Sequence, residues 1–280
     1  NMSKAFGIVN FAGNHIQVDG LQAYRPVGAF SFLGRYRTID FPISNMSNSG
    51  IDNIEVYVRR KPRSLTEHLG TGRHYNINSK RGQLNIMYTE NNRIGDIYST
   101  DVAAYIENMD CIERIHLPYV VIAPSYMVYT ADYSTFLSEH IESGADISMM
   151  YHSVDNAKEA FLNCNTLNIN KQKGVLSIEP NHGNAKNKNI SMDTYVMSTE
   201  LFINLVKKAH KTSSMYTFAD ILNEECEELD IRAVSHRGYF AAICDFNSYY
   251  HANMDLIDLK HASDLFSPDW PIYTRTNDSC

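Results

Sequence analysis

The sequence predicts an α/β fold built around a mixed, mostly parallel sheet. Short apolar runs alternate with segments of helical periodicity over residues 5–152, a pattern typical of strands joined by crossover helices. Residues 119–123 are continuously apolar, which indicates a strand buried on both faces of a sheet. Gly144 closes a helical run that ends at residue 142, in a position where glycine commonly ends a helix.

Strands and helices alternate regularly in the first half of the chain. Strands are expected at 5–10, 54–58, 119–123 and 147–152, and helices at 41–50, 98–112 and 132–142. Asp40 is expected to cap the first of these helices, because a short polar side chain there accepts from free backbone N–H groups. Ser99 or Thr100 is expected to begin the second helix.

The second half begins with a hairpin and then returns to alternating elements. Its expected elements are a hairpin of 166–169 and 175–178, a polar loop at 181–189, a strand at 190–197, a helix at 200–210 capped by Ser198, a helix at 218–228, strands at 231–236 and 239–243, and a helix at 246–259. No internal repeat is visible.

Composition and charge exclude several classes of protein. The 280 residues are 44% hydrophobic and 20% charged, and no apolar run approaches the roughly 20 residues that a membrane helix needs. The net charge of −7 argues against a nucleic-acid partner. The five cysteines contain no C-x-x-C motif and the histidines no H-E-x-x-H motif. We therefore expect reduced thiols, no zinc site and a cytoplasmic protein without a signal peptide.

The most specific stretch of the chain is 32–53, which reads FLGRYRTIDFPISNMSNSGIDN. It resembles the FGGKYR-IDFPLSN-NSGI signature of the ADP-glucose pyrophosphorylases, or glucose-1-phosphate adenylyltransferases. The order of elements over 5–259 is also similar, which implies a Rossmann-like nucleotide-diphospho-sugar transferase fold. On this basis residues 3–262 are expected to form a nucleotidyltransferase-like domain. Residues 263–280 are expected to be a linker toward a C-terminal β-helix domain that is absent from this chain.

The resemblance implies a reaction of ATP with glucose 1-phosphate, yet two of the required phosphate-binding elements differ here. The family uses a Gly-rich loop to bind phosphates and a lysine to neutralise the charge that develops on the α-phosphate. The equivalent loop at 10–19 keeps only Gly13 of these glycines. The lysine position of the family's R-x-K-P motif is Val27. Both changes predict the loss of nucleotide chemistry.

The two metal-binding positions implied by the resemblance also differ. The family holds Mg²⁺ with two aspartates, and their positions in this chain are Tyr126 and Ala242. A phenol is a poor magnesium ligand at neutral pH, and a methyl group is none. A shift of one turn would instead place Asp245 at the second position. We expect no catalytic residues, no metal ligands and no cofactor.

Three short motifs resemble the family's sugar-binding side. The E-K-P motif corresponds to Glu179 and Pro180, with the lysine absent. The S-M-G-x-Y motif includes Ser191, and Asp193 replaces its glycine. The F-G-K-D motif corresponds to residues 218–220, ending at Asp220, again without the lysine. Glu179, Ser191, Asp193 and Asp220 are therefore the candidates for a sugar pocket.

Arginines near the signature are candidates for binding a phosphorylated effector. These are Arg25, Arg35, Arg37, Arg59 and Arg60. An arginine fork binds an oxyanion at least as well as the lysine found in the family's K-[FY]-R motif. Two alternatives stay open: Arg35 and Arg37 cap or pair with the helix after Asp40, and the basic residues from 59 to 81 belong to a solvated loop and short helix.

These observations predict a non-catalytic or weakly catalytic regulatory subunit of ADP-glucose pyrophosphorylase that acts in glycogen synthesis. Its expected partner is a homologous catalytic subunit, with a sugar phosphate as effector and with neither nucleic acid nor membrane as a partner. One alternative is an active adenylyltransferase with atypical site residues. A second alternative is a stand-alone sensor of sugar phosphates or nucleotide sugars.

Overall fold

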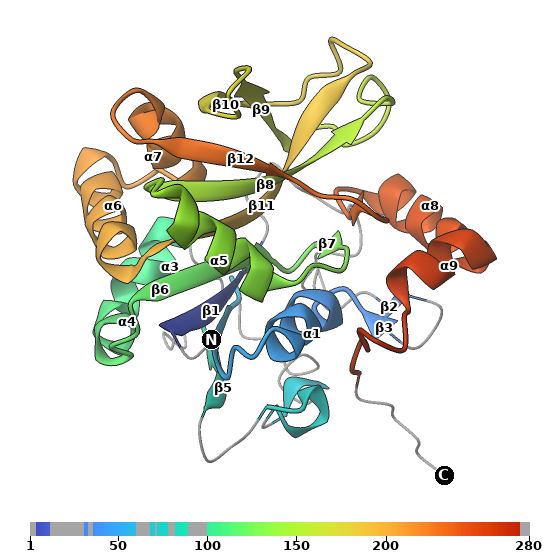
Figure 1. The fold of residues 1–280 in the computed structure, drawn as a ribbon, viewed down its shortest axis with the longest axis horizontal. Coiled ribbons are helices and arrows are strands. Elements are labelled where there is room, and N and C mark those ends of the chain that lie inside the picture. Colours follow the sequence, from blue (N-terminus) through green and yellow to red (C-terminus); the bar gives the residue numbers. More distant parts are fainter. Residues whose placement is uncertain are drawn as a thin grey trace, which may run out of the picture.

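The computed structural model describes residues 4–11, 31–32, 36–59, 68–70, 72–77, 82–88 and 100–274. Within this part of the chain, nine strands form one mixed sheet with helices on both faces (Figure 1). The α/β fold predicted from the sequence is confirmed. None of the helices in these ranges combines the length and apolar character needed to cross a bilayer.

The first half of the sheet is parallel. Its central strand β1 (Ala5–Asn10) lies between β4 (Asn53–Tyr57) and β6 (Tyr119–Pro124) and is parallel to both. Strand β5 (Gln83–Met87) continues the sheet beyond β4, also in parallel. On the far side of β6 lies β11 (Lys188–Ser198), which is antiparallel. The strand direction therefore changes between β6 and β11.

The second half of the sheet is built on β11. Strand β8 (Ile147–Val154) pairs antiparallel with β11 and parallel with β12 (Ile231–Ser235). The predicted hairpin is confirmed as β9 (Asn165–Ile169) and β10 (Val175–Pro180), which project at the top of Figure 1. This hairpin joins the sheet where Ile190 of β11 pairs with Thr166 of β9.

The helices and the short ladders complete the described fold. The α-helices are α1 (Asp40–Asn48), α3 (Asp101–Glu107), α4 (Met109–Arg114), α5 (Tyr133–Ser143), α6 (Thr199–Thr212), α7 (Phe218–Glu224), α8 (Phe246–Ile257) and α9 (Leu259–Leu265), with 3₁₀ turns η3 (Arg73–Tyr75) and η4 (Glu225–Glu227). Two short antiparallel ladders join β2 (Ser31–Phe32) to β3 (Tyr36–Arg37) and β7 (Met127–Val128) to β13 (Ala241–Ala242).

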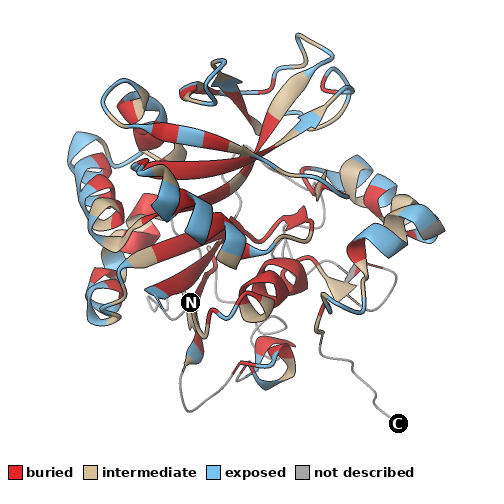
Figure 2. Cartoon of the chain, in the orientation of Figure 1, coloured by how far each residue is buried: buried red, intermediate tan, exposed pale blue. Residues whose placement is uncertain are grey.

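Alternate residues of the central strands face two separate hydrophobic cores. On β6, Val121 and Ala123 belong to one core, whereas Val120 and Ile122 belong to the other. Helices α1, α5 and α8 contribute to the first core, and α3, α4, α6 and α7 contribute to the second. Figure 2 shows the central strands of the sheet buried and the outer faces of the helices exposed. Burial on both faces explains why the sequence of β6 is continuously apolar.

Several predicted elements differ in extent from those observed. The helix predicted at 98–112 is divided into α3 and α4 at Asn108, and the helix predicted at 246–259 is divided into α8 and α9 at Asp258. The Asp258 side chain accepts from Lys260 N at 3.0 Å, so it begins a new helix inside an otherwise helical pattern. The strand predicted at 239–243 is reduced to β13.

The chain after α9 lies along α1. The Trp270 indole N–H donates to Asn45 Oδ1 at 2.9 Å, and Tyr273 N donates to Ser44 Oγ at 2.9 Å. Phe266, between α9 and this segment, stacks on Tyr36 with ring centroids 4.7 Å apart. Residues 266–273, which the sequence assigned to a linker, therefore contact the body of the described fold.

Candidate functional site

A cavity of about 410 Å³ opens where the parallel strands end. In open α/β sheets, ligands bind beyond the carboxyl ends of the strands, near a change in strand order. Asn10 at the end of β1 and Pro124 at the end of β6 line this cavity, and Arg59 follows β4. Its other described lining residues are Phe11, Thr100, Asp101, Tyr126, Asn163, Asn165, Pro180, His182, Asp193, Tyr195, Met215, Thr217, Phe218, Ala219 and Asp220.

Asp193 reaches the cavity because β11 is irregular at this residue. The register of β11 against β8 shifts between Ser191 and Tyr195, and Asp193 has a φ of 47°. Bulges of this kind re-aim a side chain, and aspartate is among the few non-glycine residues that tolerate a positive φ. The backbone thus keeps the conformation that the glycine of the family motif would favour, while the side chain is a carboxylate.

Three side-chain donors surround the Asp193 carboxylate. The Tyr126 hydroxyl donates to Oδ2, while the Tyr195 hydroxyl and Ser191 Oγ donate to Oδ1 at 3.3 Å and 3.2 Å. Burial, together with the negative charge of Asp193, raises the pKa of Tyr126 well above that of an ordinary tyrosine. The same two causes act on the pKa of Tyr195. Both phenols are therefore neutral hydrogen-bond donors at neutral pH.

A second carboxylate, Asp101, lies at the start of α3. Its Oδ1 accepts from Phe218 N at 2.9 Å and from Val102 N at 2.8 Å, and its Oδ2 accepts from Asn10 Nδ2 at 3.2 Å. Burial raises the pKa of Asp101, an effect that these three donors oppose. Asp101 therefore ties the ends of β1, α3 and α7 together at the cavity.

The structure brings the two predicted metal positions together. Ala242 of β13 pairs with Met127 of β7, and Ile243 N donates to Tyr126 O at 2.8 Å. Both Tyr126 and Ala242 are buried. Asp245, the alternative second ligand, accepts from Ser248 N at 2.7 Å and forms the capping box of α8.

These residues do not fit a Mg²⁺ ion. Magnesium prefers carboxylate, carbonyl and water oxygens in an octahedral arrangement. Tyr126 presents a neutral hydroxyl that is bonded to Asp193, and Ala242 presents a methyl group. The oxygens of Asp101 and Asp193 already accept from protein donors. Among the described residues, no group of three histidine, cysteine or acidic side chains could hold a metal ion.

The four sugar-side candidates gather in one region. Asp193 and Asp220 line the cavity, and Ser191 lies buried behind Asp193. Glu179 lines an adjoining cavity of about 210 Å³ that shares Pro180 with the first. Asp220 also completes the capping box of α7 with Thr217.

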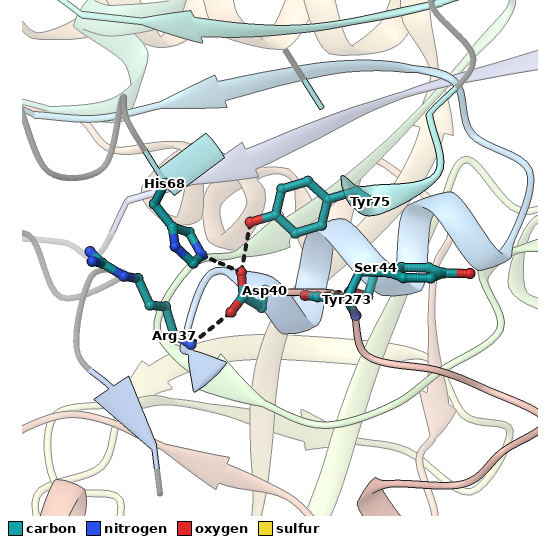
Figure 3. Close-up of polar contacts among 6 residues, drawn as sticks. All are labelled: Arg37, Asp40, Ser44, His68, Tyr75 and Tyr273. Atoms are coloured by element: carbon teal, nitrogen blue, oxygen red, sulfur yellow. Dashed lines mark hydrogen bonds and ion pairs between the residues drawn. The ribbon is translucent and has the colours of Figure 1, made fainter. Parts of the chain in front are cut away.

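The effector candidates are divided between two places. Arg59 lines the cavity, with its guanidinium carbon 5.7 Å from the centroid of the Phe11 ring. Arg37 lies beside α1, and its guanidinium points away from Asp40 (Figure 3). Arg25, Arg35 and Arg60 lie outside the described residues, as does Val27.

Asp40 of the signature is a buried hydrogen-bond centre. Its Oδ1 contacts His68 Nε2 and the Tyr75 hydroxyl, both at 2.6 Å, and its Oδ2 accepts from Arg37 N at 2.7 Å (Figure 3). The prediction that Asp40 caps the helix is wrong. Ile39 occupies the cap position, and Asp40 is the first residue of α1. The Asp40 side chain instead holds η3 and β3 against this helix.

Several residues of the cavity were not identified from the sequence. Asp101 was overlooked because its partners Asn10 and Phe218 are far away in the chain. One usable signal was present: an aspartate directly after the helix cap Thr100. Asn163 and Asn165 lie in a stretch without a periodic pattern. Their position at the cavity depends on how the chain folds and could not be inferred from the local sequence.

The mixed sheet and the cavity at the ends of β1 and β6 define an α/β protein of the nucleotidyltransferase class. The chain belongs to the nucleotidyl transferase family, whose model matches residues 12–258.

Two proteins with similar sequences carry more specific names. The chain is 30% identical over 256 residues to a glucose-1-phosphate adenylyltransferase of Clostridioides difficile, covering 89% of this chain and 65% of that protein. It is 27% identical over 282 residues to the glycogen biosynthesis protein GlgD of Geobacillus stearothermophilus, covering 99% of this chain and 70% of that protein. The chain thus spans less than two thirds of the length of the first relative.

A solved structure shares the fold. The structure of a protein from Bacillus anthracis assigned as a glucose-1-phosphate thymidylyltransferase, in complex with a sucrose, superposes with a TM-score of 0.70. The match covers 95% of this chain and 98% of that chain at 13% identity. At this identity the likeness concerns the fold alone.

Proposed function

We propose that this chain is the nucleotidyltransferase-like part of a regulatory subunit of ADP-glucose pyrophosphorylase, in the synthesis of glycogen. The observation that carries the proposal is the pair Tyr126 and Ala242, which lie close together where the family's two metal-binding aspartates are expected. The fold and the cavity are present, whereas the groups that the reaction requires are replaced.

The chemistry of nucleotidyl transfer explains why these replacements matter. Negative charge develops on the α-phosphate during transfer, and a metal ion with cationic side chains must stabilise it. Removing one electrostatic group of this kind commonly costs about 10²–10³ in rate. Replacement of both metal-binding positions supports a subunit without significant turnover, rather than an active enzyme with atypical residues.

The similar proteins support glycogen synthesis as the setting. One is named glucose-1-phosphate adenylyltransferase, and another is named a glycogen biosynthesis protein. We propose that residues 3–262 form the nucleotidyltransferase-like domain and that 263–280 lead toward a β-helix domain. The contacts of Trp270 and Tyr273 with α1 would then fix the direction in which the chain leaves this domain.

The partner in this proposal is a homologous catalytic subunit. A subunit that keeps the fold but lacks catalytic groups can still act on an active homologue if the two share an interface. It would then shift the active subunit between conformational states. A sugar phosphate is the effector class that we propose. Arg59 at the cavity and Arg37 beside α1 are the described arginines that would bind its phosphate, with Arg25, Arg35 and Arg60 as further candidates.

The test is an assay of ADP-glucose formation with three samples: this chain, a catalytic homologue from the same cell, and their co-expressed mixture. We expect the mixture to differ from the homologue alone in rate or in its response to a sugar phosphate. Arg59→Ala should weaken that response without preventing co-purification, whereas Arg232→Ala, at an exposed side chain of β12 outside the cavity, is the matched control. A mixture that behaves as the sum of its separate parts would contradict the proposal.

A stand-alone sensor remains the second candidate because the cavity of about 410 Å³ is large enough for a small ligand. A ligand-induced rise in the unfolding temperature, without co-purification or activation, would favour the sensor.

A further inference from the structure

Two free thiols from distant parts of the sequence meet beside the cavity. Cys164 lies directly before β9, and Cys244 lies between β13 and α8. Their Sγ atoms are 2.9 Å apart. An S–S bond is about 2.05 Å long, so the two sulfurs need to approach by only roughly 0.9 Å to become bonded.

Hydrogen bonds hold the backbone of both cysteines in place. Asn181 N donates to Cys164 O at 2.7 Å, and Cys164 N donates to Phe161 O at 3.2 Å. Cys244 N donates to Ser248 Oγ at 2.8 Å, within the capping box of α8. The proximity of the sulfurs is therefore set by two anchored backbone segments, which gives their reaction a high effective concentration.

We propose that Cys164 and Cys244 are a modification site, at which they form a reversible intramolecular disulfide by exchange with a small-molecule disulfide. Cys244, which is 8% exposed, loses its proton and attacks one sulfur of the reagent. This forms a mixed disulfide and releases the first small thiol. Cys164, which is fully buried, then loses its proton and attacks Cys244 Sγ, releasing the second small thiol. Two protein thiols are oxidised, and one small disulfide is reduced to two thiols.

The order of the two steps follows from the surroundings of each sulfur. The hydrogen bond with Cys244 and burial raise the pKa of Cys164, which disfavours its thiolate. The Cys164 sulfur is fully buried and contacts the Cys244 sulfur, whereas Cys244 keeps limited access to solvent. Cys164 therefore acts second, as the resolving thiol.

The disulfide would join one wall of the cavity to the segment that precedes α8. Cys164 lies between Asn163 and Asn165, both of which line the cavity. Cys244 follows Ile243, whose N–H is bonded to Tyr126. Oxidation would therefore link the residue that precedes β9 covalently to the segment that precedes α8. This inference stands on the thiol geometry and is independent of the proposed regulatory function.

The test uses the whole chain incubated with oxidised glutathione, followed by acid quenching and alkylation of free thiols. The five cysteines of the reduced chain should fall to three alkylated sites, and peptide mapping should find residues 164 and 244 linked. The link closes a separation of 80 residues, so we expect the Tm to rise by roughly 5–10 °C, reversibly on adding dithiothreitol.

Variants supply the matched comparison. Cys164→Ser and Cys244→Ser should each abolish the loss of two thiols and the shift in Tm. The double variant C111S/C226S, which removes one exposed and one half-buried cysteine outside the pair, should retain both effects. Glutathione adducts alone, links between other cysteines, or five free thiols in excess oxidant would each overturn the proposal. The wild-type peptide map decides the matter even if a variant fails to fold.

Discussion

The hydroxyl of Tyr126 donates a hydrogen bond to the carboxylate of Asp193 at the wall of the cavity. By resemblance to the family, the first position is expected to carry an aspartate and the second a glycine. In this chain the acidic group stands at the second position, and the first supplies its hydrogen-bond donor. The two changes are chemically complementary, because an unpaired carboxylate in so enclosed a place would be costly.

Replacing Asp193 should increase the affinity for a sugar phosphate. A carboxylate at the cavity wall repels a phosphate, and removing that repulsion at an intermediate dielectric should strengthen binding roughly 10–100-fold. Asp193→Asn removes the charge and keeps the volume, whereas Asp193→Gly removes both and suits the φ of 47°. Calorimetric titration with glucose 1-phosphate measures the effect.

Asp155→Asn, an exposed change outside this cavity, is the control for general effects of charge. Equal affinity of wild type, Asp193→Asn and Asp193→Gly would show that Asp193 does not face the bound ligand. A gain in the glycine variant alone would assign the effect to volume rather than to charge.

Glu55 should make stability fall as the pH rises. Burial raises its pKa from 4.5 to about 7, an effect that the Tyr57 hydrogen bond partly opposes. The folded state therefore holds this proton more tightly than the unfolded chain does. The stabilising contribution of the Glu55 proton is fully present below about pH 4.5. It decreases as the pH rises to about 7, by roughly 3 kcal/mol in total. Glu55→Gln should progressively gain stability over the wild type across this window.

Urea unfolding of wild type and Glu55→Gln at several pH values provides the difference profile. Glu107→Gln, at an exposed position of α3, is the matched control. A Glu55→Gln difference that stays constant from pH 4.5 to 7 would rule out this assignment.

The histidine pair His152 and His236 should have the opposite effect on stability. Their Nδ1 atoms are 3.0 Å apart, and His236 Nε2 contacts Thr130 O at 2.9 Å. Since a carbonyl only accepts, His236 carries its proton on Nε2, and His152 therefore donates from Nδ1. Burial and then His236 lower the pKa of His152 to about 4.

Because the pKa of His152 is depressed on folding, its contribution is present above the unfolded value of 6.5 and is lost as the pH falls toward 4. Because His152 is half-buried, solvent screens part of this effect, and the loss should amount to roughly 1–2 kcal/mol. His152→Asn should reduce this loss, and His210→Asn, on an exposed part of α6, should not. Equal acid sensitivity of wild type and His152→Asn would contradict the pairing. Because Glu55 acts oppositely over much of this range, only such difference profiles separate the two groups.

Much of the fold could be predicted from local patterns, because they report which face of a strand or helix is buried. The bounds of β1 were predicted without error, and the predicted end of α5 at Gly144 is confirmed by its φ of 71°. Strand β5 was missed because its residues, QLNIM, mix apolar and amide side chains without a clear period.

The site was harder to predict, because its geometry depends on contacts between distant residues. Tyr126 and Ala242 could be located by motif, yet their proximity follows from the β7–β13 ladder. The polar partners of Asp101 and the approach of Cys164 to Cys244 leave no periodic signal in the sequence. Such contacts become visible only when the strands and helices are assembled.

Asp40 should be essential for stability. It is fully buried and contacts His68, Tyr75 and the Arg37 backbone, so Asp40→Ala leaves these polar groups without their acceptor. We expect a loss of about 3–5 kcal/mol in the free energy of unfolding. Tyr75→Phe, which removes one donor, should cost about 1–3 kcal/mol.

Urea denaturation measures both losses, and Asp110→Ala at an exposed position of α4 is the control. If Asp40→Ala is too unstable to purify, the smaller loss in Tyr75→Phe still tests the arrangement. Wild-type stability in Tyr75→Phe would show that this hydrogen bond contributes little to the fold.

The most direct test of the central claim is the turnover number of the purified chain alone with ATP, glucose 1-phosphate and Mg²⁺. Formation of ADP-glucose and release of pyrophosphate should be measured beside an active homologue under the same conditions. With Tyr126 and Ala242 at the two positions where the family resemblance predicts metal-binding aspartates, we expect a rate at least about 10³-fold below that of the homologue. A turnover of about 1–10³ s⁻¹, the range of ordinary enzymes, would contradict the assignment of a non-catalytic regulatory subunit.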